Sequence, residues 1–204
     1  LEDAQDIPFS VKVKESGVYF QYGRTGDKHH LTPELSVQIQ ANLGSDIALI
    51  LDEFPGYPFE YERTKKAIER TARWAERSKK EFSAIGGSAF GGENRQLQFG
   101  IIQGANFPDL RELSAKQIRA LDFDGYAIGG VAVGEPAEDM YRAVEALVPH
   151  LEEDKFRHLL GVGTPENIIQ AVARGCDSFD CVIPTREARH GKAYISHDDG
   201  YAAI

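Results

Sequence analysis

The segment Cys176-Asp177-Ser178-Phe179-Asp180-Cys181-Val182-Ile183-Pro184-Thr185-Arg186-Glu187-Ala188-Arg189-His190-Gly191 combines a short apolar run with one central carboxylate and two arginines. Residues 179–183 are predicted to form a strand that carries Asp180 in its middle and ends at Pro184. A buried acid is costly unless a partner satisfies it. We therefore expect one of two arrangements. Either Asp180 forms a structural ion pair with a nearby arginine, or the two arginines bind an anionic ligand, such as a phosphorylated one, beside Asp180.

Upstream of this segment, apolar runs alternate with patterns of helical periodicity. The predicted strands are 46–51, 97–102, 125–128, 158–162 and 179–183. The predicted helices are 33–43, with Thr32 as the N-cap, then 60–82, 108–121, 137–147 and 164–175. Such alternation predicts parallel β/α units joined by right-handed crossovers. Residues 9–22 instead alternate apolar and polar side chains around a Glu-Ser-Gly turn, which predicts a β-hairpin.

Polar residues and glycines follow successive predicted strands at their carboxyl ends. These residues are Asp52-Glu53, Gln103-Gly104, Gly129-Gly130 and Gly161-Val162-Gly163, with Asp180 on the last strand. This distribution is typical of the active-site face of a (β/α)₈ TIM barrel, whereas an open doubly wound sheet gathers its site at one switch point. Because about five parallel units are visible and eight close a barrel, we expect an incomplete α/β barrel plus the N-terminal hairpin, in one domain over residues 1–204.

Apolar residues repeat at helical spacing in the first two predicted helices. Leu35, Ile39 and Leu43 repeat at helical spacing in the first helix, and Trp74 with its neighbours Ile68, Ala72 and Ala75 should form the stripe of the second. The glycine-rich segment 86–94 that follows could cradle a phosphate, but no preceding strand or following Lys-Ser/Thr accompanies it. A flexible connection is the simpler interpretation.

Composition restricts the class of protein. With 204 residues, 42% of them hydrophobic and 27% charged, the chain fits one soluble globular domain. No membrane-spanning run or signal peptide is visible, and two cysteines are too few for a disulfide framework or a four-thiolate zinc site, so we expect a cytoplasmic protein. A net charge of −9 argues against nonspecific nucleic-acid binding but leaves room for a local basic patch.

The run 179–191 resembles the signature of the tRNA-guanine transglycosylases, the queuine tRNA-ribosyltransferase family. The resemblance extends in family order through residues 129–136, 99–104 and 51–53, and it covers about residues 44–194. It implies a (β/α)₈ barrel and a cytoplasmic pentosyltransferase of queuosine biosynthesis that exchanges guanine at the tRNA wobble position for a 7-deazaguanine. The implied partners are tRNA, the base and a second copy of the full-length protein, and no membrane is involved.

The resemblance also implies roles for individual residues. Asp180 matches the nucleophile that holds the ribose covalently, with net retention as in retaining glycosidases. The positions matching base-binding residues are Asp52, Gln103, Gly129, Gly130, Glu135 and Leu160, and those matching tRNA-binding arginines are Arg186 and Arg189. The simpler interpretations are a tight turn at the two glycines and a solvated charged turn at the two arginines.

The sequence departs from the family pattern in several places. Phe54 stands where bacterial members typically have cysteine, and Leu160 replaces a methionine. An N-terminal Asp-Ser-Gly-Gly-Phe block, with a second catalytic aspartate, and a C-terminal Cys-x-Cys-x-x-Cys…His zinc subdomain do not appear. We therefore expect a partial chain, inactive by itself, with no metal or other cofactor here and zinc in the full-length protein.

Val133 and the following Gly-Glu resemble bacterial members, which use 7-aminomethyl-7-deazaguanine. Two other functions compete with this interpretation. One is a non-catalytic relative that binds tRNA or a catalytic partner, and the retained Asp180 argues against it. The other is a different phosphate-binding barrel enzyme, which the 180–186 match disfavours.

Overall fold

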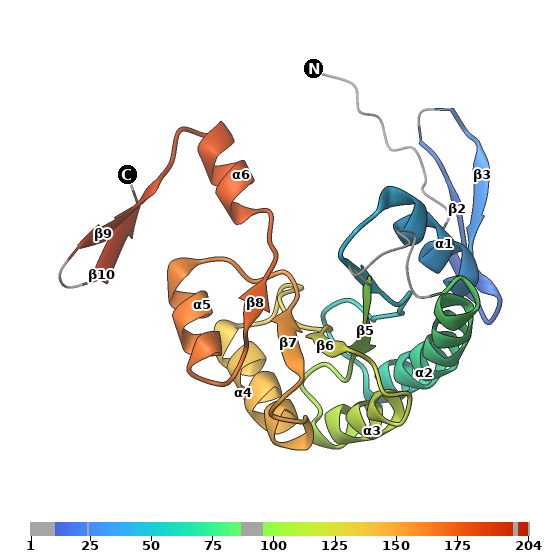
Figure 1. Cartoon of the computed structure of the whole chain (residues 1–204). Helices are drawn as coiled ribbons and strands as arrows, with labels where there is room; N and C mark the ends of the chain where they lie inside the picture. The colour runs from blue at the N-terminus through green and yellow to red at the C-terminus, as the bar shows by residue number, and fades with distance from the viewer. Residues whose placement is uncertain (1–10, 24, 87–95, 198–199, 204) are drawn as a thin grey trace.

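A computed structural model describes residues 11–23, 25–86, 96–197 and 200–203. Its main element is a five-stranded parallel sheet in which the strands follow one another in chain order. The strands are β4 (Ile47–Leu49), β5 (Leu97–Ile102), β6 (Gly125–Ile128), β7 (Phe156–Leu159) and β8 (Ser178–Phe179). The sheet curls with its helices outside, which confirms the incomplete (β/α)₈ barrel (Figure 1).

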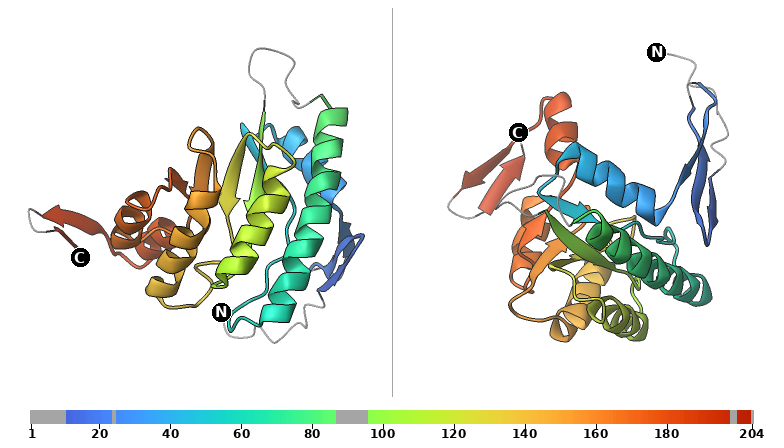
Figure 2. Two further views of the ribbon diagram at one scale, coloured as in Figure 1. Left: turned by 90° about the horizontal axis from the view of Figure 1, so that it is seen from below. Right: turned by 45° about the vertical axis from the view of Figure 1, so that its right-hand side comes forward.

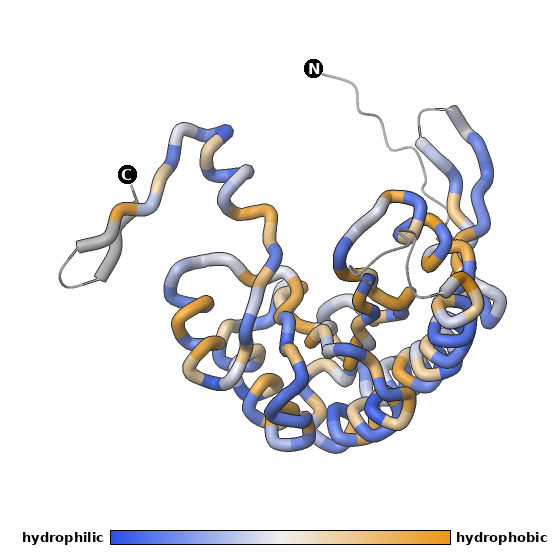
Figure 3. The backbone as a smooth tube through the Cα atoms, in the orientation of Figure 1, coloured by the Kyte–Doolittle hydropathy of each residue, from blue (hydrophilic) through white to orange (hydrophobic). Residues whose placement is uncertain are grey.

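Helices pack side by side around the outside of the sheet (Figure 2). They are α1 (Pro33–Leu43), α2 (Tyr61–Ala84), α3 (Pro108–Arg119), α4 (Ala137–Leu147) and α5 (Pro165–Val172), with a short 3₁₀ turn at Val148–His150. The core between sheet and helices includes Ile102, Phe123, Ile128, Val144 and Leu159, all fully buried. Apolar and polar residues alternate along the helices, as expected for helices with one face on the sheet (Figure 3).

A separate antiparallel sheet lies at the N-terminal end of the half-barrel. It consists of β1 (Lys12–Lys14), β2 (Gly17–Gln21) and β3 (Lys28–Leu31), in that order. The predicted hairpin is present between residues 12 and 21, whereas its residues 9 and 10 lie outside the described part. The third strand was not predicted, because its Lys-His-His-Leu sequence has no period-2 apolar pattern.

The prediction for residues 179–183 was wrong. The strand β8 ends at Phe179, and Asp180 follows it with 61% of its side chain exposed instead of being buried in a strand. Residues Ile183–Arg189 form a helix, α6, with Pro184 in its first turn. A short apolar run is ambiguous between strand and helix, and proline suits the first turn of a helix.

Smaller differences concern β7 and α1. The strand β7 begins and ends earlier than the predicted 158–162, so that Gly161 follows the strand. In α1 the buried residues include Val37 and Ala41, whereas Leu35, Ile39 and Leu43 are exposed. The apolar repeat that indicated this helix therefore lies on its exposed face.

In α2, Ile68, Trp74 and Ala75 are buried as predicted, whereas Ala72 is only partly buried. A second hairpin, β9 (Tyr194–His197) with β10 (Gly200–Ala203), was not predicted. Apart from Gly86, the glycine-rich segment lies outside the described residues. None of the helices that the structure describes is long and apolar enough to cross a membrane.

Candidate functional site

A pocket of about 190 Å³ lies at the carboxyl ends of β4 to β7. It is lined by Asp52, Phe54, Gln103, Gly129, Gly130, Val131, Ala132, Val133, Leu160 and Gly161. Five of the six residues predicted to bind a base are in this set, the exception being Glu135. The curl of the parallel sheet brings them together, because the carboxyl ends of neighbouring strands share one rim.

Asp52 and Gln103 form the polar floor of the pocket. The side-chain amide of Gln103 donates a hydrogen bond to Oδ2 of Asp52, and the backbone N–H of Gln103 donates to Oγ of Ser114 at 3.1 Å. Burial raises the pKa of Asp52 to about 6, although the Gln103 hydrogen bond lowers it. Gln103 is 1% exposed, so its amide is held in place and its donor is directed at the carboxylate.

Gly129 and Gly130 leave space for the side chain of Gln103. A Cβ at Gly129 would lie 2.5 Å from Nε2 of Gln103, and one at Gly130 would lie 2.3 Å from its Oε1. Gly130 also has a φ of 66°, a conformation that favours glycine. The chain bends at Gly130, directly after β6, and this bend leaves room for the side-chain amide of Gln103, which lines the pocket.

Arg111 binds the backbone of the Gly129–Gly130 segment from the interior of the protein. The sequence did not point to this residue. Its guanidinium is completely buried and donates to the carbonyl oxygens of Ala105 at 2.8 Å, Gly129 at 2.7 Å and Gly130 at 3.2 Å. Burial lowers the pKa of Arg111 to about 10, so the group remains charged at neutral pH. The available signal was an arginine in helical register with the buried Ala115 and Ile118.

Glu135 shapes the loop over the pocket without lining it. Its carboxylate accepts hydrogen bonds from the backbone N–H groups of Ala132 and Val133, the latter at 2.9 Å. Ala132 has a positive φ of 58°, a backbone conformation that is costly for a residue with a side chain and that these bonds help to hold. Glu135 therefore fixes the two residues that border the pocket.

Asp180 lies next to the pocket rather than inside it. Its Oδ1 accepts a hydrogen bond from the backbone N–H of Gly161 at 3.2 Å, and Gly161 is one of the lining residues. The same oxygen lies 3.2 Å from Nε2 of His158, whose Nδ1 is 2.7 Å from Oγ of Ser178. His158 was also missed, because it reaches Asp180 from the neighbouring strand, twenty-two residues away along the chain.

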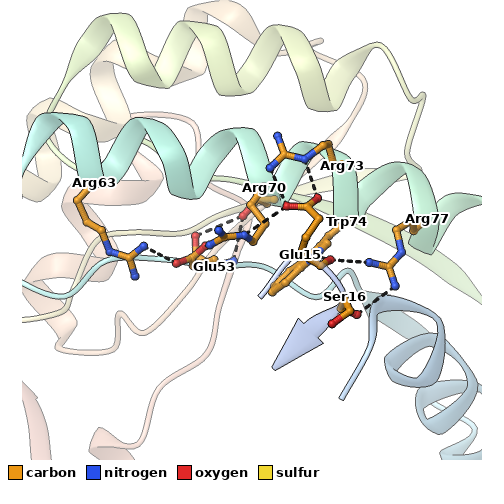
Figure 4. A network of polar contacts seen from close by, with 9 residues as sticks. Glu15, Ser16, Glu53, Arg63, Arg70, Arg73, Trp74 and Arg77 are labelled. Carbon is orange, nitrogen blue, oxygen red and sulfur yellow. Dashed lines mark hydrogen bonds and ion pairs between the residues drawn. The ribbon is translucent and has the colours of Figure 1, made fainter. Parts of the chain in front are cut away.

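Glu53 follows Asp52 but points in the opposite direction, toward α2 (Figure 4). Its buried carboxylate pairs with Arg63 at 2.6 Å and with Arg70, and its backbone N–H donates to Oγ1 of Thr71 at 2.9 Å. The charged partners on α2 hold Glu53 out of the pocket. Adjacent residues of an extended segment point to opposite sides, so this anchoring directs Asp52 inward.

The two predicted tRNA-binding arginines lie on the last described helix. Arg186 and Arg189 are both exposed in the last turn of α6, which follows directly after Asp180 and the end of β8. The neighbouring Lys192 pairs with Glu187 at 2.7 Å, so one nearby cation is already neutralised. The described part of the chain contains no group of three or more His, Cys, Asp or Glu side chains able to hold a metal.

The fold and the pocket together define a barrel-type α/β protein with a small polar binding site at the carboxyl ends of its strands, where barrel enzymes hold their substrates. The model of the TGT family, queuine tRNA-ribosyltransferase, matches residues 3–202. The chain belongs to this family, in agreement with the sequence motifs. Membership supports a transferase that acts on tRNA and on a base.

Proposed function

We propose that this chain forms the base-exchange site of a tRNA-guanine transglycosylase. Guanine at the wobble position would be replaced by 7-aminomethyl-7-deazaguanine through a covalent bond between the ribose and Asp180. The observation that carries the proposal is the arrangement of one pocket, where Asp52 and Gln103 meet the Gly129–Gly130 turn. Asp180 is hydrogen-bonded to Gly161 of the same pocket wall.

The reaction needs a nucleophile on one side of the ribose and base recognition on the other. An ionised Asp180 attacks the anomeric carbon, a C–O bond forms as the glycosidic C–N bond breaks, and guanine takes up a proton as it leaves. The incoming base then displaces the aspartate, loses its N9 proton and restores the original configuration. The hydrogen bond from the backbone N–H of Gly161 holds Oδ1 of Asp180 beside the pocket wall, where this step takes place.

The family resemblance assigns the general acid and base to a segment outside this chain. The proposal therefore includes a full-length protein that supplies the remaining barrel strands and the zinc-binding subdomain, acts as a homodimer and resides in the cytoplasm. This chain alone would be inactive. Incorporation of labelled guanine into tRNA by the full-length protein tests the function, and tRNA binding without exchange would favour the non-catalytic relative instead.

The pH dependence of base binding provides a test of Asp52. Ionised Asp52 accepts hydrogen bonds from N1–H and N2–H₂ of guanine, whereas protonated Asp52 loses that capacity. Because the pKa of Asp52 is raised to about 6, the affinity for free guanine should fall by about tenfold per pH unit below that value and level off above it.

The Asp52→Asn variant should bind guanine more weakly by about 1–3 kcal/mol at pH 7.5, since an amide leaves polar groups unpaired. Its affinity should no longer change near pH 6. Isothermal titration of the full-length protein between pH 5 and 8 measures both quantities. A wild-type affinity that stays constant over this range would contradict the assignment of Asp52.

Phe54 is expected to set the preference between bases. Phe54 lines the pocket together with Val133, and it is half exposed. Phe54→Cys should change the discrimination between guanine and the 7-aminomethyl base by about 1–3 kcal/mol, the range for hydrophobic pocket changes. The ratio of kcat/KM values for the two bases measures this shift, and an unchanged ratio would show that the ring does not contact the 7-substituent.

A further inference from the structure

The three-stranded N-terminal sheet has a face that the proposed base exchange does not use. Directly opposed residues in antiparallel strands share one face, and the pairs Lys12–Tyr19, Tyr19–His30 and Gln21–Lys28 place these side chains together. Lys14, two residues from Lys12, lies on the same side, with its ammonium group 5.2 Å from the centre of the Tyr19 ring. We call this set the basic face: Lys12, Lys14, Tyr19, Gln21, Lys28 and His30.

The charge of the basic face contrasts with that of the whole chain. The chain carries a net charge of −9, yet the strand residues 12–14, 17–21 and 28–31 include three lysines and no acid. In the part of the chain that the structure describes, none of the three lysines forms an ion pair. The acids in the adjoining turns are engaged elsewhere, since Glu15 binds Arg73 at 2.7 Å and Asp27 binds Thr25.

The basic face also offers aromatic surface beside the cations. The ring of Tyr19 stacks on His30 with centroids 3.9 Å apart, and 37% of Tyr19 is exposed. A hollow of about 240 Å³ is lined by the three lysines, Tyr19 and Gln21, together with Phe20 and His29. Lysines around an exposed aromatic ring match the chemistry of an RNA strand, with phosphates for the cations and a base or ribose for the ring.

The sheet is attached to the rim that carries the pocket. Arg70 of α2 bridges Glu15, in the β1–β2 turn, and Glu53, the neighbour of Asp52 (Figure 4). The indole N–H of Trp74 donates to the carbonyl oxygen of Glu15 at 2.8 Å, which anchors the same turn. The sheet and α6 lie at the two ends of the half-barrel (Figure 1). An RNA whose flipped base enters the pocket extends its backbone on both sides of that base, so a cationic surface at each end of the half-barrel suits its phosphates.

We infer that the basic face is a second RNA-contact surface, which binds the phosphate backbone of the tRNA on the side of the pocket opposite to α6. The inference rests on the proposed function for the identity of the RNA. It accounts for how a chain with a net negative charge can hold a polyanion, because two local cationic surfaces flank the base pocket while the acids are distributed over the rest of the molecule.

The test replaces the three lysines by glutamine in the full-length protein, as K12Q/K14Q/K28Q. All three side chains are exposed, so the substitutions should leave the fold intact, which thermal unfolding verifies. The matched control, K66Q/K80Q/K116Q, removes three exposed lysines from α2 and α3. Binding of a fluorescently labelled tRNA anticodon stem-loop is followed by anisotropy at several salt concentrations, and binding of free guanine is measured in parallel.

The triple variant should bind the stem-loop at least about tenfold more weakly at low salt. The slope of log Kd against log salt should also fall by about 2, because each phosphate contact to a single strand contributes about 0.7 to that slope and three contacts are lost. The control should bind within about twofold of wild type, and all three proteins should bind guanine equally. Equal RNA affinity in the triple variant and the control would overturn the inference. So would a change of oligomeric state without loss of RNA affinity. If the triple variant loses RNA affinity but the wild-type protein exchanges no base, the result counts against the proposed function and leaves the RNA-contact surface standing.

Discussion

Replacing Asp180 by asparagine is expected to abolish base exchange, with a loss on the order of a thousandfold or more, because an amide cannot form the covalent bond to the ribose. The variant keeps the size of the side chain and an oxygen that can accept from the N–H of Gly161. Since 61% of the Asp180 side chain is exposed, the fold should tolerate the change. Affinity for tRNA should stay close to that of wild type.

The covalent adduct distinguishes this role from a structural one. When guanine has left and no incoming base is present, the full-length wild-type protein should retain labelled tRNA after denaturation, and Asp180→Asn should not. Asp52→Asn serves as the comparison, because it weakens base recognition but keeps the nucleophile. An adduct that persists in Asp180→Asn and disappears in Asp52→Asn would show that the two aspartates have the opposite roles.

The second large effect is expected for Arg111, as a loss of stability. Arg111→Met removes the donors for the carbonyl groups of Ala105, Gly129 and Gly130 and leaves them unpaired in the interior. We expect the free energy of unfolding to fall by about 3–5 kcal/mol, which is a large part of the total stability of a typical domain. Fluorescence of Trp74, the one tryptophan of the chain and fully buried, reports unfolding in urea.

Two further variants show whether the effect belongs to the site. Arg119→Met, on the same helix, breaks an exposed pair with Glu152 and should cost at most about 1 kcal/mol. Arg111→Lys keeps the charge but not the planar fork, so it should fold while binding guanine more weakly than wild type. If Arg111→Met and Arg119→Met cost the same, the buried guanidinium is not what holds the Gly129–Gly130 turn.

The central part of the fold was predictable because its signals are local. The bounds of β5, β6 and α4 agree with the sequence prediction. The strands β5 and β6 are short, mainly apolar runs of six and four residues, whereas α4 spans eleven residues with helical periodicity. The strand β8 was not predictable in the same way. It pairs with β7 on one side only, and its apolar run continues into α6, so that periodicity alone could not locate its end.

Some residues of the site were also predictable from the sequence, whereas others were not. Asp52, Gln103 and the Gly129–Gly130 pair stand where strands end, and the order of the chain predicts a shared rim for such positions. Arg111 and His158 do not stand at the carboxyl end of a strand, so the sequence did not single them out. Arg111 bonds to backbone carbonyls, which leave no trace in the sequence pattern, and His158 meets Asp180 only because β7 and β8 lie side by side.

The sequence by itself therefore determined the β/α alternation, the polar strand ends and the family, because each of these is written in the order and periodicity of the residues. Only the tertiary structure decided which way the side chains point. Asp52 faces the pocket while Glu53 faces α2, Glu135 binds its own loop, and three lysines gather on one face of a small sheet. These outcomes depend on partners distant in the chain, whose positions are set by how the sheet curls and how the helices pack around it.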